Sequence, residues 1–237
     1  MEEGVQFSVS LSERPELLML IQQFSHRPQA WMADEYWTRF TTFNGWSGAE
    51  SIRDLDESNR SQRRLAGLIE KHFNLDPLSY SVFVRPSNRF ALLSPRLLER
   101  LTYQTGLMRL SPMLAASIHR NRVLRIIEQI GEESYREAIS HGPLTVGASY
   151  RGVEVSDSQI ENELDPTIRS IGWLGLGQAL SGAPEGILQR TFLKFASSVS
   201  DQIEKGAKRE EREHGITDLM LRILKLHVNR RAATCVF

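Results

Sequence analysis

The chain has 237 residues, of which 41% are hydrophobic and 24% are charged, and its 29 basic and 29 acidic side chains cancel. This mixture is typical of a soluble globular chain, so it excludes the disordered and membrane-embedded classes. The zero net charge also excludes a long-range field that would draw the molecule onto nucleic acid or an anionic bilayer, so charged recognition must be local.

The cysteine content and the lack of long apolar runs indicate a compartment. Cys235 is the one cysteine of the chain, so an intrachain disulfide is impossible and a reducing environment is expected. The N-terminus lacks the basic and apolar regions of a signal peptide, and no run approaches the ~20 apolar residues of a spanning helix. We therefore expect a cytoplasmic protein, or one that faces the cytoplasm, without direct membrane insertion.

The first third of the chain is expected to hold two helices and a short strand. Apolar side chains at spacings of three and four predict a helix from residue 12 or 15 to about residue 24, which Pro28 ends. A second helix is predicted over 57–73. The β-branched and aromatic run at 80–84 predicts a short strand, which the Arg85-Pro86 pair ends.

Residues 31–46 concentrate aromatic side chains, including Trp31 and Trp37, and end in turn signals. Two interpretations are open. In one, the rings fill a core, because each aromatic side chain buries a large apolar area. In the other, they face a partner, because tryptophan and tyrosine dominate the energetics of interfaces.

Two Ser-Pro pairs predict helix starts in the middle of the chain. Ser94-Pro95 and Ser111-Pro112 each place an N-cap oxygen before a proline, whose missing N–H is no loss at the first helical position. The next helix is expected to follow Gly131 and to stop at the His-Gly-Pro sequence of residues 141–143.

The last part of the chain alternates a loop with further helices. Residues 147–166 hold five acids and several turn formers, which predict a loop or a lobe boundary. A glycine-rich apolar helix is expected at 168–180, a shorter one at 187–195, and a long final helix at 198–231, whose first half is charged.

These elements predict a mainly α, compact multi-helix protein, in one body or in two lobes, with the minor short-strand element. As domains we predict an N-terminal aromatic-rich helical lobe, 1–85, and a helical core with a charged C-terminal helix, 86–237. No internal repeat or low-complexity tract is found.

The search for catalytic motifs is mostly negative. The glycine run at 172–177 lacks the third glycine and the preceding strand of a dinucleotide fingerprint, so close helix packing is the better interpretation. Glu211 and His214 form one Glu-x-x-His, whereas di-iron bundles need two copies and two more glutamates. Nucleophile, phosphate-binding and zinc motifs are missing from the sequence. We therefore expect no enzyme activity, cofactor or metal, although a dispersed catalytic site would escape this search.

One charge pattern remains, because residues 100–127 contain five arginines, Arg100 among them, and no acid. Guanidinium groups fit carboxylates and phosphates alike, so an acidic protein partner or nucleic acid would suit this surface. Neutralisation by the acidic stretch at 152–166, or plain solvation, is the alternative. The candidate partner-binding residues are Arg109, Arg120, Arg122, Arg125, Glu161, Glu163, Trp31 and Trp37.

Residues 90–195 resemble a known family. The middle of the chain is similar to the SctK proteins (YscK and PscK type) of bacterial type III secretion systems. The resemblance is carried by Leu92-Leu93-Ser94-Pro95, by Thr105 to Pro112, by Ile118 to Ile130 and Gly131 to Arg136, by Gly142-Pro143-Leu144, and by Gly172-Trp173-Leu174 and Pro184 to Phe195.

The resemblance implies a non-enzymatic adaptor of the sorting platform at the cytoplasmic face of the inner membrane. Such an adaptor would bridge the cytoplasmic domain of the inner-membrane ring protein (SctD-like) to the pod protein (SctQ-like), without binding nucleic acid. Two alternatives stay open on the residues alone, namely a basic helical nucleic-acid-binding or regulatory protein and an enzyme with a dispersed site.

Overall fold

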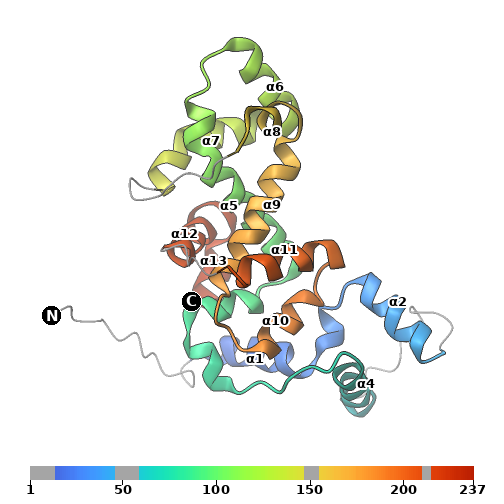
Figure 1. The fold of residues 1–237 in the computed structure, drawn as a ribbon. Helices are drawn as coiled ribbons and strands as arrows, with labels where there is room; N and C mark the ends of the chain where they lie inside the picture. Colours follow the sequence, from blue (N-terminus) through green and yellow to red (C-terminus); the bar gives the residue numbers. More distant parts are fainter. Residues whose placement is uncertain (1–13, 46–58, 147–154, 210–214) are drawn as a thin grey trace. The chain divides into compact units, whose positions relative to one another are not determined.

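The computed structural model describes residues 14–45, 59–146, 155–209 and 215–237, and the regular elements in these ranges are all helical (Figure 1). The prediction of a mainly α protein is confirmed. Contacts divide the chain into two compact units: unit 1 takes 1–95, 182–200 and 234–237, and unit 2 takes 96–181 and 201–233. Whether 1–85 and 86–237 are separate lobes stays a prediction.

Unit 1 is assembled from short helices. In chain order these are α1 (Pro15–His26), a 3₁₀ turn (Pro28–Ala30), α2 (Asp34–Phe43), α4 (Asn59–His72), two further 3₁₀ segments (Tyr80–Val84 and Pro86–Leu92) and α10 (Glu185–Phe192). The first helix begins at the predicted Pro15, where a proline fits the first turn. It buries the predicted apolar face, with Leu17, Ile21 and Phe24 no more than 1% exposed.

The predicted strand at 80–84 is wrong, because Tyr80–Val84 is a 3₁₀ helix. A strand needs a neighbour to accept its backbone hydrogen bonds, and none is present among the described residues. Side chains donate to the backbone carbonyls of this segment instead. Asn88 Nδ2 donates to the Val82 carbonyl and Arg89 Nε donates to the Phe83 carbonyl, both at 2.7 Å. Phe83 is fully buried, with its ring 6.0 Å from that of Phe24.

The aromatic segment of unit 1 fills a core. Three rings of α2 are buried, with Trp37 only 2% exposed. They pack with Met32, Leu65, Ile69 and Leu193. The core interpretation therefore holds for Trp37, whereas Phe43 at the end of α2 is 76% exposed. Trp46 lies outside the described residues.

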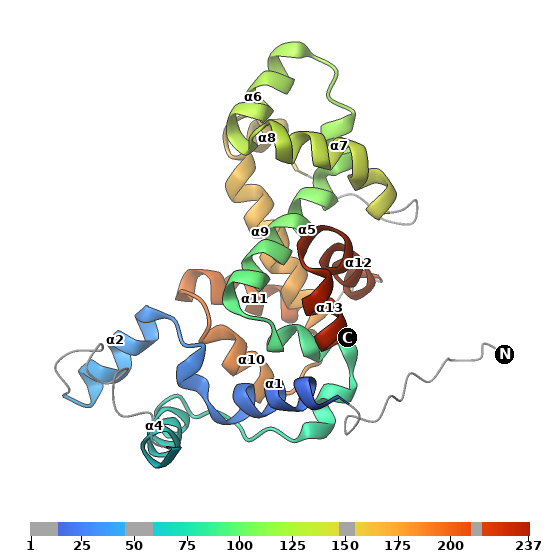
Figure 2. The same cartoon turned by 180° about the vertical axis from the view of Figure 1, so that it is seen from behind.

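Unit 2 is arranged around two long helices that lie side by side (Figures 1 and 2). These are α5 (Pro95–Ala115) and α9 (Leu164–Ala179). A Cβ on Gly106 would lie 2.0 Å from the Ile168 carbonyl oxygen, and one on Gly172 would lie 1.9 Å from that of Thr102. The predicted close helix packing through the glycines of 172–177 is thus confirmed.

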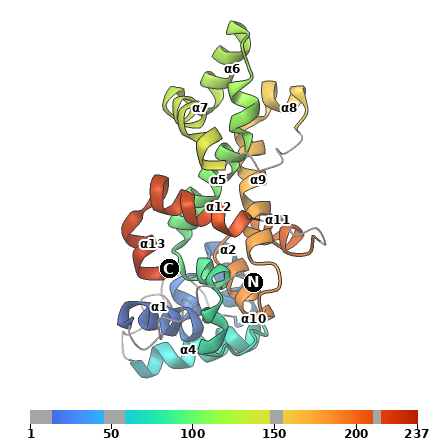
Figure 3. The ribbon, with the colours of Figure 1, turned by 90° about the vertical axis from the view of Figure 1, so that its left-hand side faces the viewer.

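Shorter helices pack against this pair. Figure 3 shows α6, α7 and α8 gathered near one end of α5 and α9. A buried apolar cluster joins them, including Leu107, Ile126, Ala138, Ile160 and Ile168. In chain order, the remaining helical elements are α6 (Arg120–Ile130), α7 (Glu132–Val146), α8 (Asp157–Asn162), α11 (Ser197–Ala207), α12 (Ile216–Ile223), a π-helical segment (Leu224–Val228) and α13 (Arg230–Val236).

Two predicted helix boundaries in unit 2 are wrong. Pro112 lies inside α5 instead of starting a helix, and α7 continues through Pro143. Both errors arise at one contact, because a Cβ on Gly142 would lie 2.1 Å from the Cβ of Ser111. The two helices cross there, so packing overrides the local signal of each proline.

The acidic stretch and the final helix also differ from expectation. The predicted loop at 147–166 contains α8, which begins at a capping box of Ser156 and Gln159, and the start of α9; residues 147–154 lie outside the described ones. The single helix predicted over 198–231 is several helices. Gly215 has a φ of +89°, a left-handed conformation that an uninterrupted helix does not contain.

Candidate functional site

Three of the four basic residues predicted to bind a partner lie on one helix of unit 2, α6. The apolar side of α6 is buried, with Ile126 at 0% and Ile130 at 8% exposure. Arg120 and Arg125 are exposed on the other side, and Arg122 is half-buried. From the sequence, Arg122 and Arg125 were expected to share a face opposite Ile126 and Ile130. This holds for the exposed Arg125 but is wrong for Arg122, which is half-buried because it lies one turn before Ile126 and two turns before Ile130.

Apolar side chains accompany these cations. Leu124, one turn after Arg120, is 48% exposed, and Ile118, just before the helix, is 85% exposed. We call Ile118, Arg120, Leu124 and Arg125 the α6 surface. Exposed apolar side chains beside guanidinium groups are a usual composition of protein interfaces, in which arginine is enriched.

Arg109 does not belong to the α6 surface. It is 7% exposed and its Nη1 donates to the Ile171 carbonyl at 3.4 Å, between α5 and α9. Arg100 is exposed on α5, with Nη2 3.4 Å from the His227 carbonyl. The five arginines of residues 100–127 therefore do not form one surface.

The acidic candidates lie at the boundary between two helices. Glu163 is exposed and lies between α8 and α9, where its backbone N–H donates to the Gln159 carbonyl at 2.9 Å. Glu161 falls within α8, and its side chain is outside the described part of the chain. Contact between these two acids and the α6 surface therefore stays a prediction.

Trp31 belongs to a buried cation site that was not foreseen in the sequence. The Lys194 ammonium is 4.8 Å from the centre of the Trp31 ring and 5.0 Å from that of Phe24. It donates to the carbonyls of Ala91 at 2.6 Å and Leu93 at 2.7 Å. Complete burial lowers the pKa of Lys194 to about 7.

Arg190, one turn before Lys194, is a second buried cation of unit 1. It is 4% exposed and donates to the carbonyls of Asp76, Gly186 and Ser25. Its Nη2 also lies 3.4 Å from Glu70 Oε1. Burial lowers the pKa of Arg190, and Glu70 opposes this shift. These two cations tie separate segments of unit 1 to one another, so we assign them a structural role.

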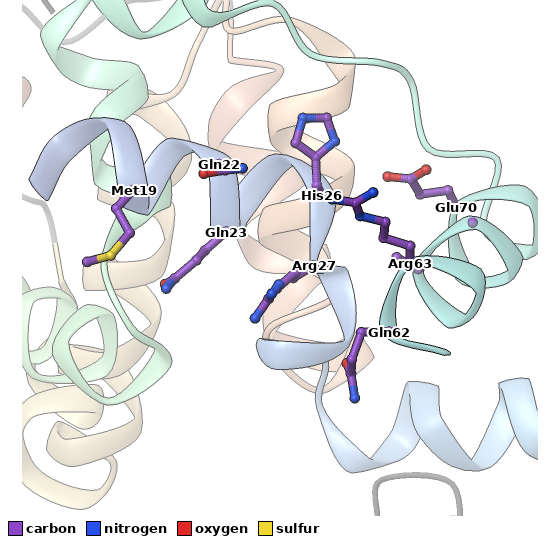
Figure 4. Close-up of a pocket in the computed structure, with 10 residues that line it drawn as sticks. Met19, Gln22, Gln23, His26, Arg27, Gln62, Arg63 and Glu70 are labelled. Carbon is purple, nitrogen blue, oxygen red and sulfur yellow. The ribbon is translucent and has the colours of Figure 1, made fainter. Parts of the chain in front are cut away.

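A groove of about 690 Å³ lies between α1 and α4 in unit 1 (Figure 4). In the figure the Arg63 side chain extends from α4 towards α1. Glu70, the acid among the lining residues, also faces Arg190. The lining consists of Met19, Gln22, Gln23, His26 and Arg27 on one side and Gln62, Arg63, Ala66, Gly67 and Glu70 on the other.

The groove was not found from the sequence, which predicted only a helix over 57–73. The usable signal was the pair Ala66-Gly67, two small residues in the middle of α4, which leave space beside the neighbouring helix. A Cβ on Gly67 would meet nothing within 4 Å. Arg190 and Lys194 were noted only as part of the family resemblance, and their position in an apolar helix was the available sign of burial.

Two further features bear on the class of protein. No group of three or more histidine, cysteine, aspartate or glutamate side chains that could hold a metal ion occurs among the described residues; His214 lies outside them. None of the helices in the described ranges combines the length and the hydropathy that crossing a membrane requires.

The fold and these surfaces define an all-helical protein. A family model described as YOP proteins translocation protein K (YscK) matches residues 23–235. No curated protein and no solved structure was found to match the chain. The chain belongs to the YscK family and is thus a YscK/SctK-type component of type III secretion. The resemblance seen over 90–195 is confirmed, and the match extends well beyond it.

Proposed function

We propose that this protein is a non-enzymatic adaptor of a type III secretion injectisome. In this proposal it acts in the cytoplasm, at the face of the inner membrane. It bridges the cytoplasmic domain of the inner-membrane ring protein to the pod protein of the sorting platform. Membership of the YscK family supports the secretion context, and the bridging role is our inference.

The observation that carries the proposal is the composition of the α6 surface. Arg120 and Arg125 are exposed beside Leu124 and Ile118, while the other side of the helix is anchored in the core. Guanidinium groups recognise carboxylates in a planar, two-pronged geometry, and complementary charge governs association and specificity. We therefore expect an acidic partner surface to dock on α6.

The test is co-purification of the tagged protein with the ring and pod proteins from secreting cells. Replacing Arg120 and Arg125 together by Glu should preserve helical content, because both side chains are exposed and Glu is nearly as good a helix former as Arg. The same variant should lose one of the two proteins and abolish secretion, because like charges then face each other.

A matched control reverses two exposed cations elsewhere in unit 2, namely Arg230 and Arg231. Acids at these positions suit the start of α13, where the helix dipole favours negative charge. This control should keep both partners. If wild type and both variants capture ring and pod equally, the α6 surface is only solvated and the interface lies elsewhere.

The same proteins are used in a salt-titrated gel-shift assay with DNA. An adaptor should show no tight binding and no difference between wild type and the α6 variant. Tight binding by the wild type, a steep salt dependence and loss in the variant would instead favour the nucleic-acid-binding function.

A further inference from the structure

We propose that the groove between α1 and α4 binds an extended acidic peptide segment of a partner protein. The inference rests on the proposed function in one respect, since an adaptor needs two separate docking surfaces and the α6 surface supplies one. Unit 1 would then hold the second. The shape of the groove, its charge and its hydrogen-bonding groups all suit such a segment.

The shape of the groove comes from small side chains in the middle of α4. Ala66 and Gly67 lie where α4 faces α1, and both belong to the groove lining. Because a Cβ on Gly67 would meet nothing within 4 Å, the space beside it is open. The lining carries no phenylalanine, tyrosine or tryptophan, so the groove lacks the large stacking rings that single-stranded nucleic acid uses.

The charge of the groove favours carboxylates. Arg27 and Arg63 contribute two guanidinium groups, and His26 stands beside them (Figure 4). The Arg63 side chain is exposed, and no hydrogen bond or ion pair of it is seen among the described residues. Glu70 is 3.4 Å from the buried Arg190, so this one acid of the lining is already opposed by a cation. A free guanidinium at a groove wall fits a carboxylate with two parallel hydrogen bonds.

The remaining polar groups match an exposed peptide backbone. Gln22 and Gln23 present side-chain amides to the groove, and an amide both donates and accepts. An extended peptide has unpaired N–H and C=O groups along its length, whereas a helical peptide has used most of its own. The combination of amides and guanidinium groups therefore suits an extended segment that contains aspartate or glutamate.

The experiment measures fluorescence anisotropy of a labelled ten-residue peptide of alternating Glu and Ser on the purified full-length protein. A peptide of alternating Gln and Ser serves as the neutral probe, and a labelled 20-nucleotide single-stranded DNA as the competing class. We expect the acidic peptide to bind at least tenfold more tightly than the neutral peptide, and the DNA not to depend on the groove.

Two pairs of variants separate the groove from general attraction. Arg63→Glu should weaken acidic-peptide binding at least tenfold, whereas Arg64→Glu, the same change at the next exposed residue outside the lining, should weaken it less than threefold. Gly67→Leu should block the groove while improving helix propensity, and Gly67→Ala should leave binding unchanged. Circular dichroism confirms that each variant is folded.

The binding results for these variants decide whether the groove binds an acidic peptide. Equal losses for Arg63→Glu and Arg64→Glu, or no loss for Gly67→Leu, would overturn the proposal. DNA binding that Arg63→Glu and Gly67→Leu both abolish would assign the groove to nucleic acid. The peptide assay does not use the α6 surface, so failure here leaves capture through Arg120 and Arg125 intact, whereas failure of capture leaves peptide binding measurable.

Discussion

Replacement of glycine by alanine should have opposite effects at Gly172, where α5 and α9 cross closely, and at Gly67 in α4. A Cβ on Gly172 would lie 1.9 Å from the Thr102 carbonyl oxygen, whereas ordinary contact begins near 3.4 Å, so Gly172→Ala must force the helices about 1.5 Å apart. Gly67 in α4 has no atom within 4 Å of the added methyl group.

The magnitudes follow from two opposing terms. Overpacking costs about 1–3 kcal/mol, and the upper end applies because the obstacle is backbone, which cannot rotate away. Alanine gains about 1 kcal/mol over glycine in a helix interior. We expect Gly172→Ala to destabilise by about 2 kcal/mol and Gly67→Ala to stabilise by about 1 kcal/mol.

Thermal unfolding followed by circular dichroism at ~222 nm, the helical minimum, measures both. A change of 1 kcal/mol shifts the Tm of a chain of this size by about 2–4 °C. The Tm of Gly172→Ala should fall by about 4–8 °C, and that of Gly67→Ala should rise by about 2–4 °C. An unchanged or higher Tm for Gly172→Ala would refute the close crossing.

The remaining predictions concern charged groups. Burial lowers the pKa of Lys194 to about 7. Above that pH the unfolded chain therefore binds more protons than the folded chain, and stability rises with pH. In urea titrations, the stability of wild type relative to Lys194→Met should rise between pH 7 and 9. Arg190→Lys should destabilise by at least about 2 kcal/mol in the same assay, because one ammonium cannot serve the separate carbonyls that the guanidinium reaches. Glu163→Gln should change stability by less than about 0.5 kcal/mol, because the side chain is exposed; a larger loss would mean that it is part of the fold.

Sequence reasoning found the elements whose signals are local. The start of α1 at Pro15 and the start of α5 at Pro95 depend on proline at a first turn, and the buried face of α6 depends on helical spacing. These features need no knowledge of distant residues. The helical character of the chain could therefore be predicted from the sequence.

The errors occur where distant residues decide. Ser111 and Gly142 are 31 positions apart in the chain, and their contact lets α5 and α7 continue past prolines that end helices elsewhere. The 80–84 segment has the composition of a strand but finds carbonyl partners in the side chains of Asn88 and Arg89. The first error needs a contact that no local window contains, whereas the second needs side-chain geometry only six residues away, which composition does not reveal.

In the candidate site too, local signals could be predicted and contacts between distant residues could not. The exposure of Arg120 and Arg125 follows from the spacing of α6, but the burial of Arg109 follows from the approach of α9, which the sequence does not reveal. The groove requires α1 and α4 to lie side by side, and residues 62–70 alone indicate only an amphipathic helix.

The discontinuity of unit 1 has a consequence for synthesis on the ribosome. Leu17, Ile21 and Phe24 are buried in a unit that also requires residues 182–200, including Lys194 against the Ala91 and Leu93 carbonyls. At about 5–20 residues per second, translation from residue 95 to residue 194 takes about 5–20 s. During that interval the nascent α1 exposes its apolar face, so the N-terminal segment is an expected chaperone client until the middle of the chain has been made.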